Sequence, residues 1–305
     1  MGNTARDGDT TPAPTGILLV DKPQGWTSHD VVARARRLLG TKKVGHAGTL
    51  DPMATGLLLL GVGKGTRLLT YLVGEDKTYS AVIRLGSSTP TDDADSTADA
   101  FADPTRLGGI TDDDIRAGIS ALTGDIQQVP SAVSAIKVDG VRSYQRVRAG
   151  EDVVLKPRPV LIRRFELLDV QREVGAIDLS VTVECTSGTY VRALARDLGN
   201  GLGVGGHLTA LRRTLVGRFS VNEALELPGW DEPAETPALM SLAEVARKCL
   251  AVRDLSDDDV RALGYGQWIA ESSNPGPVAC IGQQGDLVAI VENIRGKAKP
   301  VVVFS

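Results

Sequence analysis

The sequence predicts an α+β fold, in which strands and helices follow one another in mixed order before a small C-terminal β module. Three observations support this class. Segments of strand and helix length occur without the regular strand–helix–strand alternation of a parallel sheet. The chain of 305 residues is 42% hydrophobic but only 4% aromatic, which indicates a sizeable aliphatic core. Short apolar runs separated by glycines near the C-terminus are typical of the strands of a small barrel.

Alternating or continuous apolar runs predict the strands of the core. They are Gly16–Val20, Leu57–Val62, Tyr79–Leu85 and Ile177–Cys185. The last run is the clearest, because apolar and polar residues alternate along its whole length. Such alternation is typical of a strand with one buried face.

Helical spacing of apolar residues, together with capping residues, predicts the helices. They are a helix capped by Thr27 or Ser28 and ended by Gly40, Ile110–Leu122 capped by Thr111, Tyr190–Leu198 ended by Gly199, Ser241–Cys249 and Ser256–Leu263. The segment 186–189 is the expected turn and N-cap before Tyr190. Residues 45–56 and the Asp-rich residues 91–104 are predicted loops, the second of them exposed.

The chain divides into a tail and two domains. Residues 1–15 are polar, lack the apolar stretch of a signal peptide and are predicted to be disordered. Residues 16–238 form the large domain, with an excursion at about 124–150 and a closing linker rich in Pro and acidic residues. Residues 239–305 form the small domain. Its expected strands are Val278–Ile281, Leu287–Val291 and Val301–Phe304.

The cysteine content and hydropathy argue against several classes of protein. Cys185, Cys249 and Cys280 lie far apart, no CxxC pair is present, and the chain has only three histidines. This pattern argues against a zinc site and a disulfide framework and fits a reducing cytoplasm. No apolar run approaches the ~18 residues that span a membrane. We therefore expect a cytoplasmic protein with no membrane partner.

Charge is segregated along the chain, although the net charge is only −4. Residues 31–43 contain five basic side chains and no acidic one, and residues 137–164 carry a net charge of +5. Residues 92–114 carry −7. An acidic protein can therefore still present a basic face to RNA, although each cluster could also be an ordinary solvated surface.

Four long motifs stand in order along the large domain. They are Gly16–Pro23 with Gly25–Ser28, Gly45–Pro52 with Ala54–Gly56, Lys77–Tyr79 with Leu85-Gly86 and Thr91-Asp92, and Cys185–Arg192 with Asp197–Gly199. Together they resemble the TruB-type pseudouridine synthases, bacterial tRNA pseudouridine-55 synthases, over residues 16–227. The resemblance implies a mixed, largely antiparallel central sheet flanked by helices. Residues 240–305 resemble the C-terminal extension of the actinobacterial form, a PUA-like β-barrel module.

The resemblance implies that Asp51 is the nucleophile, which attacks either uracil C6 or ribose C1′. A carboxylate suits this role because it attacks readily and also leaves readily. It must be ionised in a pocket that partly excludes water, so a cation is needed to hold its pKa down. The resemblance assigns that role to Arg192, and assigns Tyr79 to stacking on a flipped uracil and assisting removal of the C5 proton. Taken alone, these residues also fit a turn, a surface ion pair and core packing.

Further residues are implied to bind the substrate. The resemblance places His46 in the stacking gap that the flipped base leaves and Tyr190 and Leu211 at the pocket wall, and it implies that Lys22 supports the active site. Tyr190, Leu211 and Lys22 fit ordinary packing or a strand end equally well.

The excursion resembles a thumb-like insertion that clamps the T stem-loop of tRNA. Its basic residues suit phosphate contacts, which give affinity and register, whereas specificity comes from the folded shape of the RNA loop. They are Lys137, Arg142, Arg146 and Arg148.

These observations predict an isomerase that converts uridine 55 of tRNA to pseudouridine by base flipping. The expected partner is the tRNA T stem-loop, with no metal or other cofactor and no obligate protein partner. Two alternatives stay open: a guide-RNA-dependent relative that shares the catalytic motifs, and a tRNA-folding chaperone whose activity is independent of catalysis. The thumb-like excursion favours the stand-alone enzyme.

Overall fold

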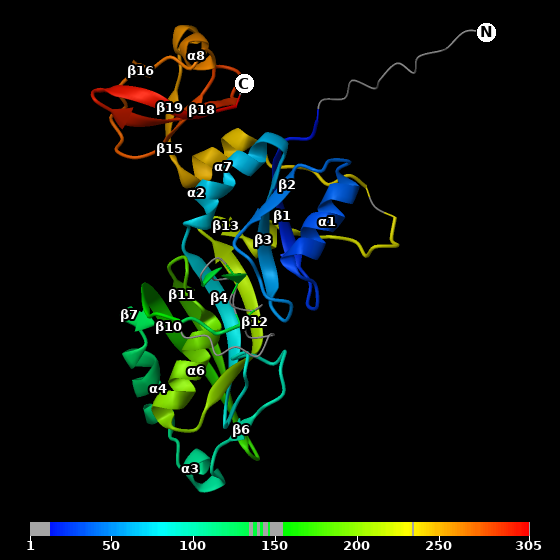
Figure 1. Cartoon of the computed structure of the whole chain (residues 1–305), viewed down its shortest axis with the longest axis vertical. Coiled ribbons are helices and arrows are strands. Elements are labelled where there is room, and N and C mark those ends of the chain that lie inside the picture. The colour runs from blue at the N-terminus through cyan, green and yellow to red at the C-terminus, as the bar shows by residue number, and fades with distance from the viewer. Residues whose placement is uncertain are drawn as a thin grey trace, which may run out of the picture.

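The computed structural model describes residues 13–133, 137–138, 141–142, 146, 155–233 and 235–304. These residues form an elongated molecule, with a large sheet along most of its length and a small sheet at one end (Figure 1). Within the described part of the chain, no helix is long and apolar enough to cross a membrane.

The large sheet has ten strands, eight of which follow one another in the order β14-β1-β3-β12-β4-β11-β10-β7. Their bounds are Leu225–Glu226, Gly16–Lys22, Thr55–Val62, Gly206–Val216, Lys77–Leu85, Ala176–Cys185, Arg158–Glu173 and Gly124–Gln128. Strand β2 (Val44–Ala47) pairs with β3, and β13 (Phe219–Ser220) pairs with β12. Among the strand pairs of this sheet in the described residues, the β1–β14 and β3–β12 pairs are parallel and the others are antiparallel. The predicted mixed, largely antiparallel sheet is therefore confirmed.

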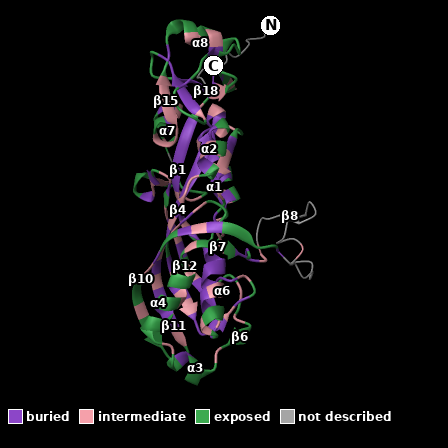
Figure 2. Ribbon diagram, turned by 90° about the vertical axis from the view of Figure 1, so that its left-hand side faces the viewer, coloured by how far each residue is buried: buried purple, intermediate pink, exposed green. Residues whose placement is uncertain are grey.

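Helices and 3-10 turns pack on the large sheet, on the small sheet and between the two. They are α1 (Ser28–Leu38), η1 (Gly63–Arg67), α2 (Leu69–Val73), α3 (Pro104–Gly108), α4 (Asp112–Ala121), α6 (Val191–Leu202), η2 (Val221–Glu223), α7 (Leu242–Cys249) and α8 (Asp257–Gly264). Helices α4 and α6 lie side by side on one face of the sheet (Figure 1), and α6 is largely buried there (Figure 2). Two further two-stranded sheets are formed by β5–β6 (Ser87–Ser88, Ala100–Phe101) and by β8–β9 (Lys137–Val138, Val141–Arg142).

The small sheet has five strands in the order β15-β17-β18-β19-β16. They are Ala251–Asp254, Val278–Ile281, Leu287–Ile294, Lys297–Val303 and Ile269–Ala270. This curled sheet matches the predicted C-terminal module. Ala246 of α7 and Ile281 of β17 share an apolar core with Leu57 of the large sheet. Because that core is continuous between the sheets, the predicted boundary at residue 238 stays a prediction.

Local capping signals predicted the starts of several helices correctly. Thr27 caps α1, and it exchanges hydrogen bonds with Asp30 in a capping box. Thr111 caps α4 in the same way. Ser241 and Ser256 cap α7 and α8.

The predicted end of the helix at Gly199 is wrong, because α6 continues to Leu202 and is closed by Gly203 at φ +71°. Gly199 instead allows close packing: a Cβ there would lie 2.2 Å from the carbonyl carbon of Gly205. The predicted N-cap in residues 186–189 is also wrong. Tyr190 is the N-cap residue, and its backbone N–H donates to Oε1 of Gln128 at 2.9 Å.

Two of the predicted loops differ from the structure. The start of residues 45–56 lies in β2, because this segment pairs with the edge of β3. In the loop 91–104, Asp92 and Asp93 are buried instead of exposed. The long strands β10 and β12 have no counterpart in the prediction, because charged residues interrupt their apolar pattern.

Gly56, at the start of β3, lies where a side chain cannot fit. Its φ is +98°, and a Cβ would lie 2.3 Å from the backbone oxygen of Arg213. We therefore predict that Gly56→Ala lowers the free energy of unfolding by about 3 kcal/mol, as measured by denaturant titration. Gly175→Ala is the matched control, since Gly175 has φ +79° but open space around it. Equal losses in the two variants would show that the contact with Arg213 is unimportant.

Candidate active site

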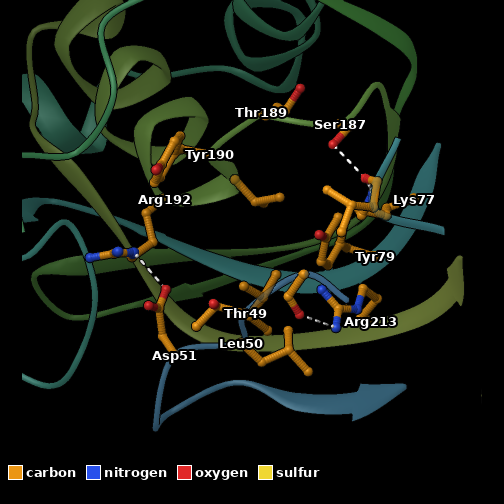
Figure 3. Close-up of a pocket in the computed structure, with 15 residues that line it drawn as sticks. Thr49, Leu50, Asp51, Lys77, Tyr79, Ser187, Thr189, Tyr190, Arg192 and Arg213 are labelled. Carbon is orange, nitrogen blue, oxygen red and sulfur yellow. Dashed lines mark hydrogen bonds and ion pairs between the residues drawn. The ribbon is translucent and has the colours of Figure 1, made fainter. Parts of the chain in front are cut away.

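A cavity of about 260 Å³ lies where the loop before β3, the strands β4 and β12 and the start of α6 meet (Figure 3). Asp51, Tyr79, Tyr190, Arg192 and Leu211 all line it. These five predicted site residues come from four separate stretches of the chain, so the fold is what brings them together. Figure 3 shows Asp51 and Arg192 at one side of the cavity, with Lys77 and Arg213 at the other.

The predicted contact between Asp51 and Arg192 is present. Oδ2 of Asp51 lies 3.0 Å from Nε of Arg192, and the two side chains are 38% and 5% exposed. The carboxylate therefore faces the cavity, whereas the guanidinium lies beneath it. A buried cation that holds one carboxylate oxygen orients the other toward whatever enters the cavity.

The guanidinium of Arg192 is itself held on its far side. Nη1 donates to the backbone oxygen of Thr91 at 2.7 Å and lies 3.3 Å from Oδ2 of Asp93. Nη2 donates to the backbone oxygen of Val133 at 2.9 Å. Arg192 thus stands between two carboxylates, and its position is fixed by backbone acceptors on two other segments.

The net effect of this environment on Asp51 differs from the expectation that a cation holds its pKa down. Burial raises the pKa of Asp51 above its ordinary value. Arg192 opposes this effect, Asp93 adds to it through like-charge repulsion, and Lys22 opposes it again. The pull of the cation is real, but desolvation prevails.

We predict a corresponding pH dependence of the reaction. The family resemblance assigns the attack to Asp51, and only an ionised carboxylate is a nucleophile, so we expect kcat/KM to fall as the pH drops through a pKa higher than that of a free aspartate. Asp93→Asn removes a like charge, lowers the pKa of Asp51 and should move this acid limb to lower pH. The profile is measured from roughly pH 4 to 8. Asp99→Asn, an exposed change in the same loop, is the control, and an unmoved limb in Asp93→Asn would contradict the assignment.

The loop that carries Asp51 is held by buried side chains from two neighbouring segments. Ser28 bonds both backbone groups of Leu50, at 2.9 Å and 3.1 Å. Nζ of Lys22 donates to the backbone oxygens of Pro23, Trp26 and Pro52. Burial lowers the pKa of Lys22 to about 8. These bonds fix the loop immediately before and after Asp51, so Lys22 supports the site from below without lining the cavity.

Two tyrosines lie on different walls of the cavity (Figure 3). Tyr79 on β4 is buried, with 7% of its surface exposed, and burial raises the pKa of its phenol. Tyr190 lies before α6 and is held through backbone hydrogen bonds to the side chain of Gln128, at 2.9 Å and 3.1 Å. A flat ring on a buried wall is a suitable surface for a planar base.

Of the other predicted substrate-binding residues, those that the structure describes do not line the cavity. His46 is half-buried on β2, with its ring edge-on to that of His29 at 5.8 Å between centroids. Lys137 and Arg142 lie in β8 and β9, but their side chains fall outside the described residues. Arg148 also falls outside them, and Arg146 is half-buried. The predictions for these residues therefore stay predictions.

Three charged residues at the site received no role in the sequence analysis, although Lys77 lies in one of its motifs. Arg213 and Lys77 line the cavity, and Asp93 pairs with Arg192 behind it. Burial lowers the pKa of Lys77 to about 8. A signal for Arg213 existed, since a charged residue inside an apolar run can mark a functional position in a strand. Within the described residues, no group of His, Cys, Asp or Glu side chains could hold a metal ion.

The fold and the site together define a class of protein, and family models agree. The model of the N-terminal domain of TruB family pseudouridylate synthases matches residues 36–191. Two further models, the tRNA pseudouridylate synthase B C-terminal domain and the tRNA pseudouridine synthase II C-terminal region, match residues 192–228 and 250–305. The chain belongs to the TruB family of pseudouridylate synthases, which are isomerases.

Similar proteins point to one branch of this family. A protein of Arthrobacter sp. (strain FB24) named tRNA pseudouridine synthase B is 53% identical over 95% of this chain and 97% of its own length. Proteins of the same name from Leifsonia xyli subsp. xyli and Thermobifida fusca are 54% and 50% identical over 95% of this chain and 96% and 98% of their own lengths.

Solved structures share the fold at much lower sequence identity. A chain of an H/ACA RNP bound to a substrate RNA containing 2′-deoxyuridine has a TM-score of 0.70 at 22% identity, over 98% of this chain and 92% of its own. A chain of a Cbf5-Nop10-Gar1 complex has a TM-score of 0.69 at 24% identity, over 95% and 84%. These likenesses confirm the predicted fold class.

Proposed function

We propose that this protein converts uridine 55 in the T loop of tRNA to pseudouridine, in the cytoplasm and without a cofactor. The observation that carries the proposal is the Asp51 carboxylate, held by Arg192 at a cavity that also contains Tyr79. Relatives at about half identity are named tRNA pseudouridine synthase B, which supports tRNA as the substrate.

The reaction needs the base to leave the RNA stack and enter the cavity, since the target atoms are otherwise inaccessible. The Asp51 carboxylate then forms a bond to C6 of the uracil or to C1′ of the ribose. The N1–C1′ bond breaks, the uracil turns while it is held, and a C5–C1′ bond forms. The hydrogen on C5 leaves as a proton, and the carboxylate is released.

The surrounding residues make each step plausible. Arg192 keeps the nucleophile aimed at the cavity, and the bonds of Lys22 and Ser28 hold its loop still. The ring of Tyr79 provides a stacking surface for the turning base, which is worth ~1–3 kcal/mol for one base. Leu211 adds an aliphatic side chain to the cavity wall.

Binding of the RNA outside the cavity is assigned to basic and planar side chains. His46 would occupy the gap that the flipped base leaves in the T loop. Lys137, Arg142, Arg146 and Arg148 of the excursion would contact phosphates and set the register of the stem-loop. These contacts should make binding strongly dependent on salt.

A tritium-release assay tests the proposal. A tRNA transcript labelled at uracil C5 loses its label when the C5–C1′ bond forms, so the pure protein should release tritium without any guide RNA or second protein. A transcript with cytidine at position 55 is the control and should give no release from that site. If the intact transcript releases no tritium until a guide RNA is added, the protein is instead a guide-dependent enzyme.

A further inference from the structure

Arg213 is a buried cation beside the reaction cavity to which neither the sequence nor the family resemblance assigned a role. It lies on β12 with only 1% of its surface exposed, yet its guanidinium reaches the cavity wall. A guanidinium is costly to remove from water unless a counter-ion or several acceptors replace the lost hydration. Among the ion pairs of the described residues, none includes Arg213. Hydrogen-bond acceptors around Arg213 must therefore compensate for the lost hydration of its guanidinium.

Backbone acceptors replace the missing counter-ion, and they belong to the catalytic loop and the strand after it. Nε of Arg213 donates to the backbone oxygen of Leu57 at 2.7 Å. Nη2 donates to the backbone oxygen of Gly48 at 3.0 Å. Gly48 lies three residues before Asp51, so the guanidinium ties the loop of the nucleophile to the central sheet.

The side chain of Arg213 also lies beside the aromatic wall of the cavity. Arg213 and Tyr79 are directly opposed partners on the antiparallel strands β12 and β4, so their side chains emerge on the same face of the sheet. Figure 3 shows the two side chains next to each other. Burial raises the pKa of the Tyr79 phenol, and the nearby charge of Arg213 acts in the opposite direction.

We propose that Arg213 is a positioning residue that couples the Asp51 loop to Tyr79, so that nucleophile and stacking ring keep their spacing when the base turns. The proposal rests on the proposed function and names a further determinant of the same reaction. A guanidinium is suited to this task because its fixed fork serves several acceptors at once, whereas an ammonium group cannot span them. Arg213 does not need to touch the RNA in order to act.

A double-mutant cycle tests the coupling. Single-turnover tritium release, and KM from multiple-turnover release, are measured for the wild type, Arg213→Lys, Tyr79→Phe and the double variant. We expect Arg213→Lys to lower the rate by roughly 10²-fold, because a displacement of ~1 Å can cost that much. KM for the transcript should stay within about twofold, since Arg213 is buried. In the Tyr79→Phe background, which lacks the hydroxyl, the cost of Arg213→Lys should fall to about tenfold or less.

Matched variants guard against trivial explanations. Arg212→Lys changes the neighbouring residue of β12, which pairs with Asp21 at 2.6 Å and does not line the cavity, so its rate should stay near that of the wild type. Arg213→Met keeps most of the side-chain volume and removes the charge and both backbone hydrogen bonds, so it serves as the second variant in case Arg213→Lys unfolds. Its cost should show the same dependence on the Tyr79 hydroxyl.

Two results would overturn the inference. One is an equal cost of the Arg213 variants with and without the Tyr79 hydroxyl, and the other is a loss that appears in KM alone. The free energy of unfolding of the same four proteins is also measured by denaturant titration, which gives the coupling energy between positions 213 and 79 independently of the reaction. Absent coupling there rejects the inference, whereas a wild type that releases no tritium rejects the proposed function instead.

Discussion

Asp51→Asn is expected to reduce tritium release by roughly 10⁴-fold or more, because an amide has the shape of the carboxylate but is not a nucleophile. The fold should survive the change. The Asp51 side chain faces the cavity with 38% of its surface exposed, and the hydrogen bonds of Lys22 and Ser28 go to the loop backbone. Affinity for the transcript should stay within a few-fold, which a filter-binding titration measures.

Asp178→Asn provides the matched control for this experiment. Asp178 forms an ion pair with Arg84 on the large sheet and does not line the cavity. Its replacement shows what the loss of one paired carboxylate outside the site does to the rate. Release by Asp51→Asn above about a hundredth of the wild-type rate would exclude Asp51 as the nucleophile. Asp51→Asn also distinguishes catalysis from a chaperone activity, since assistance to tRNA folding should persist in this variant.

Elements with strong local signals were predictable from the sequence. Thr27 and Thr111 cap their helices through side-chain bonds that involve only residues three positions away. The strand Ala176–Cys185 alternates perfectly because one face packs on the core and the other does not. Strand β12 was not predictable, because the pair Arg212-Arg213 interrupts its apolar pattern, and only the folded sheet shows that Arg213 is buried.

The site illustrates a different limit. Asp51 and Arg192 are 141 positions apart, so their contact followed from family resemblance and not from any local pattern. Asp93 was missed because it lies in a run of Asp residues that is typical of an exposed loop. The structure buries Asp93 against Arg192, where its charge is compensated. The pKa of Asp51 depends on burial and on contacts between residues far apart in the sequence, so no local sequence pattern could predict it.

Replacing Arg192 should have the second-largest effect on the reaction. Arg192→Met removes the cation between Asp51 and Asp93 and leaves two carboxylates in a partly dehydrated space. Since burial and Asp93 already raise the pKa of Asp51, loss of the opposing charge should raise it further. The acid limb of kcat/KM should then move to higher pH, and kcat should fall by roughly 10²–10³-fold even above that limb, because the carboxylate is no longer held in position.

Second variants distinguish charge from geometry. Arg192→Lys keeps the charge but loses the fork that joins Asp51, Asp93 and the backbone of Thr91. The acid limb of Arg192→Lys should therefore lie nearer that of the wild type than the limb of Arg192→Met does, whereas its kcat should stay below that of the wild type. Adding Asp93→Asn to Arg192→Met should return part of the pH shift, because one of the two repelling charges is gone.

Arg196→Met controls for the loss of an arginine from the same helix. Arg196 lies one turn further along α6, where it pairs with Asp92 and Asp197 and does not line the cavity. Its pH profile should therefore match that of the wild type. An acid limb of Arg192→Met that coincides with the limb of Arg196→Met would show that Arg192 does not control the ionisation of Asp51. The low kcat would then have to come from the geometry of the site alone.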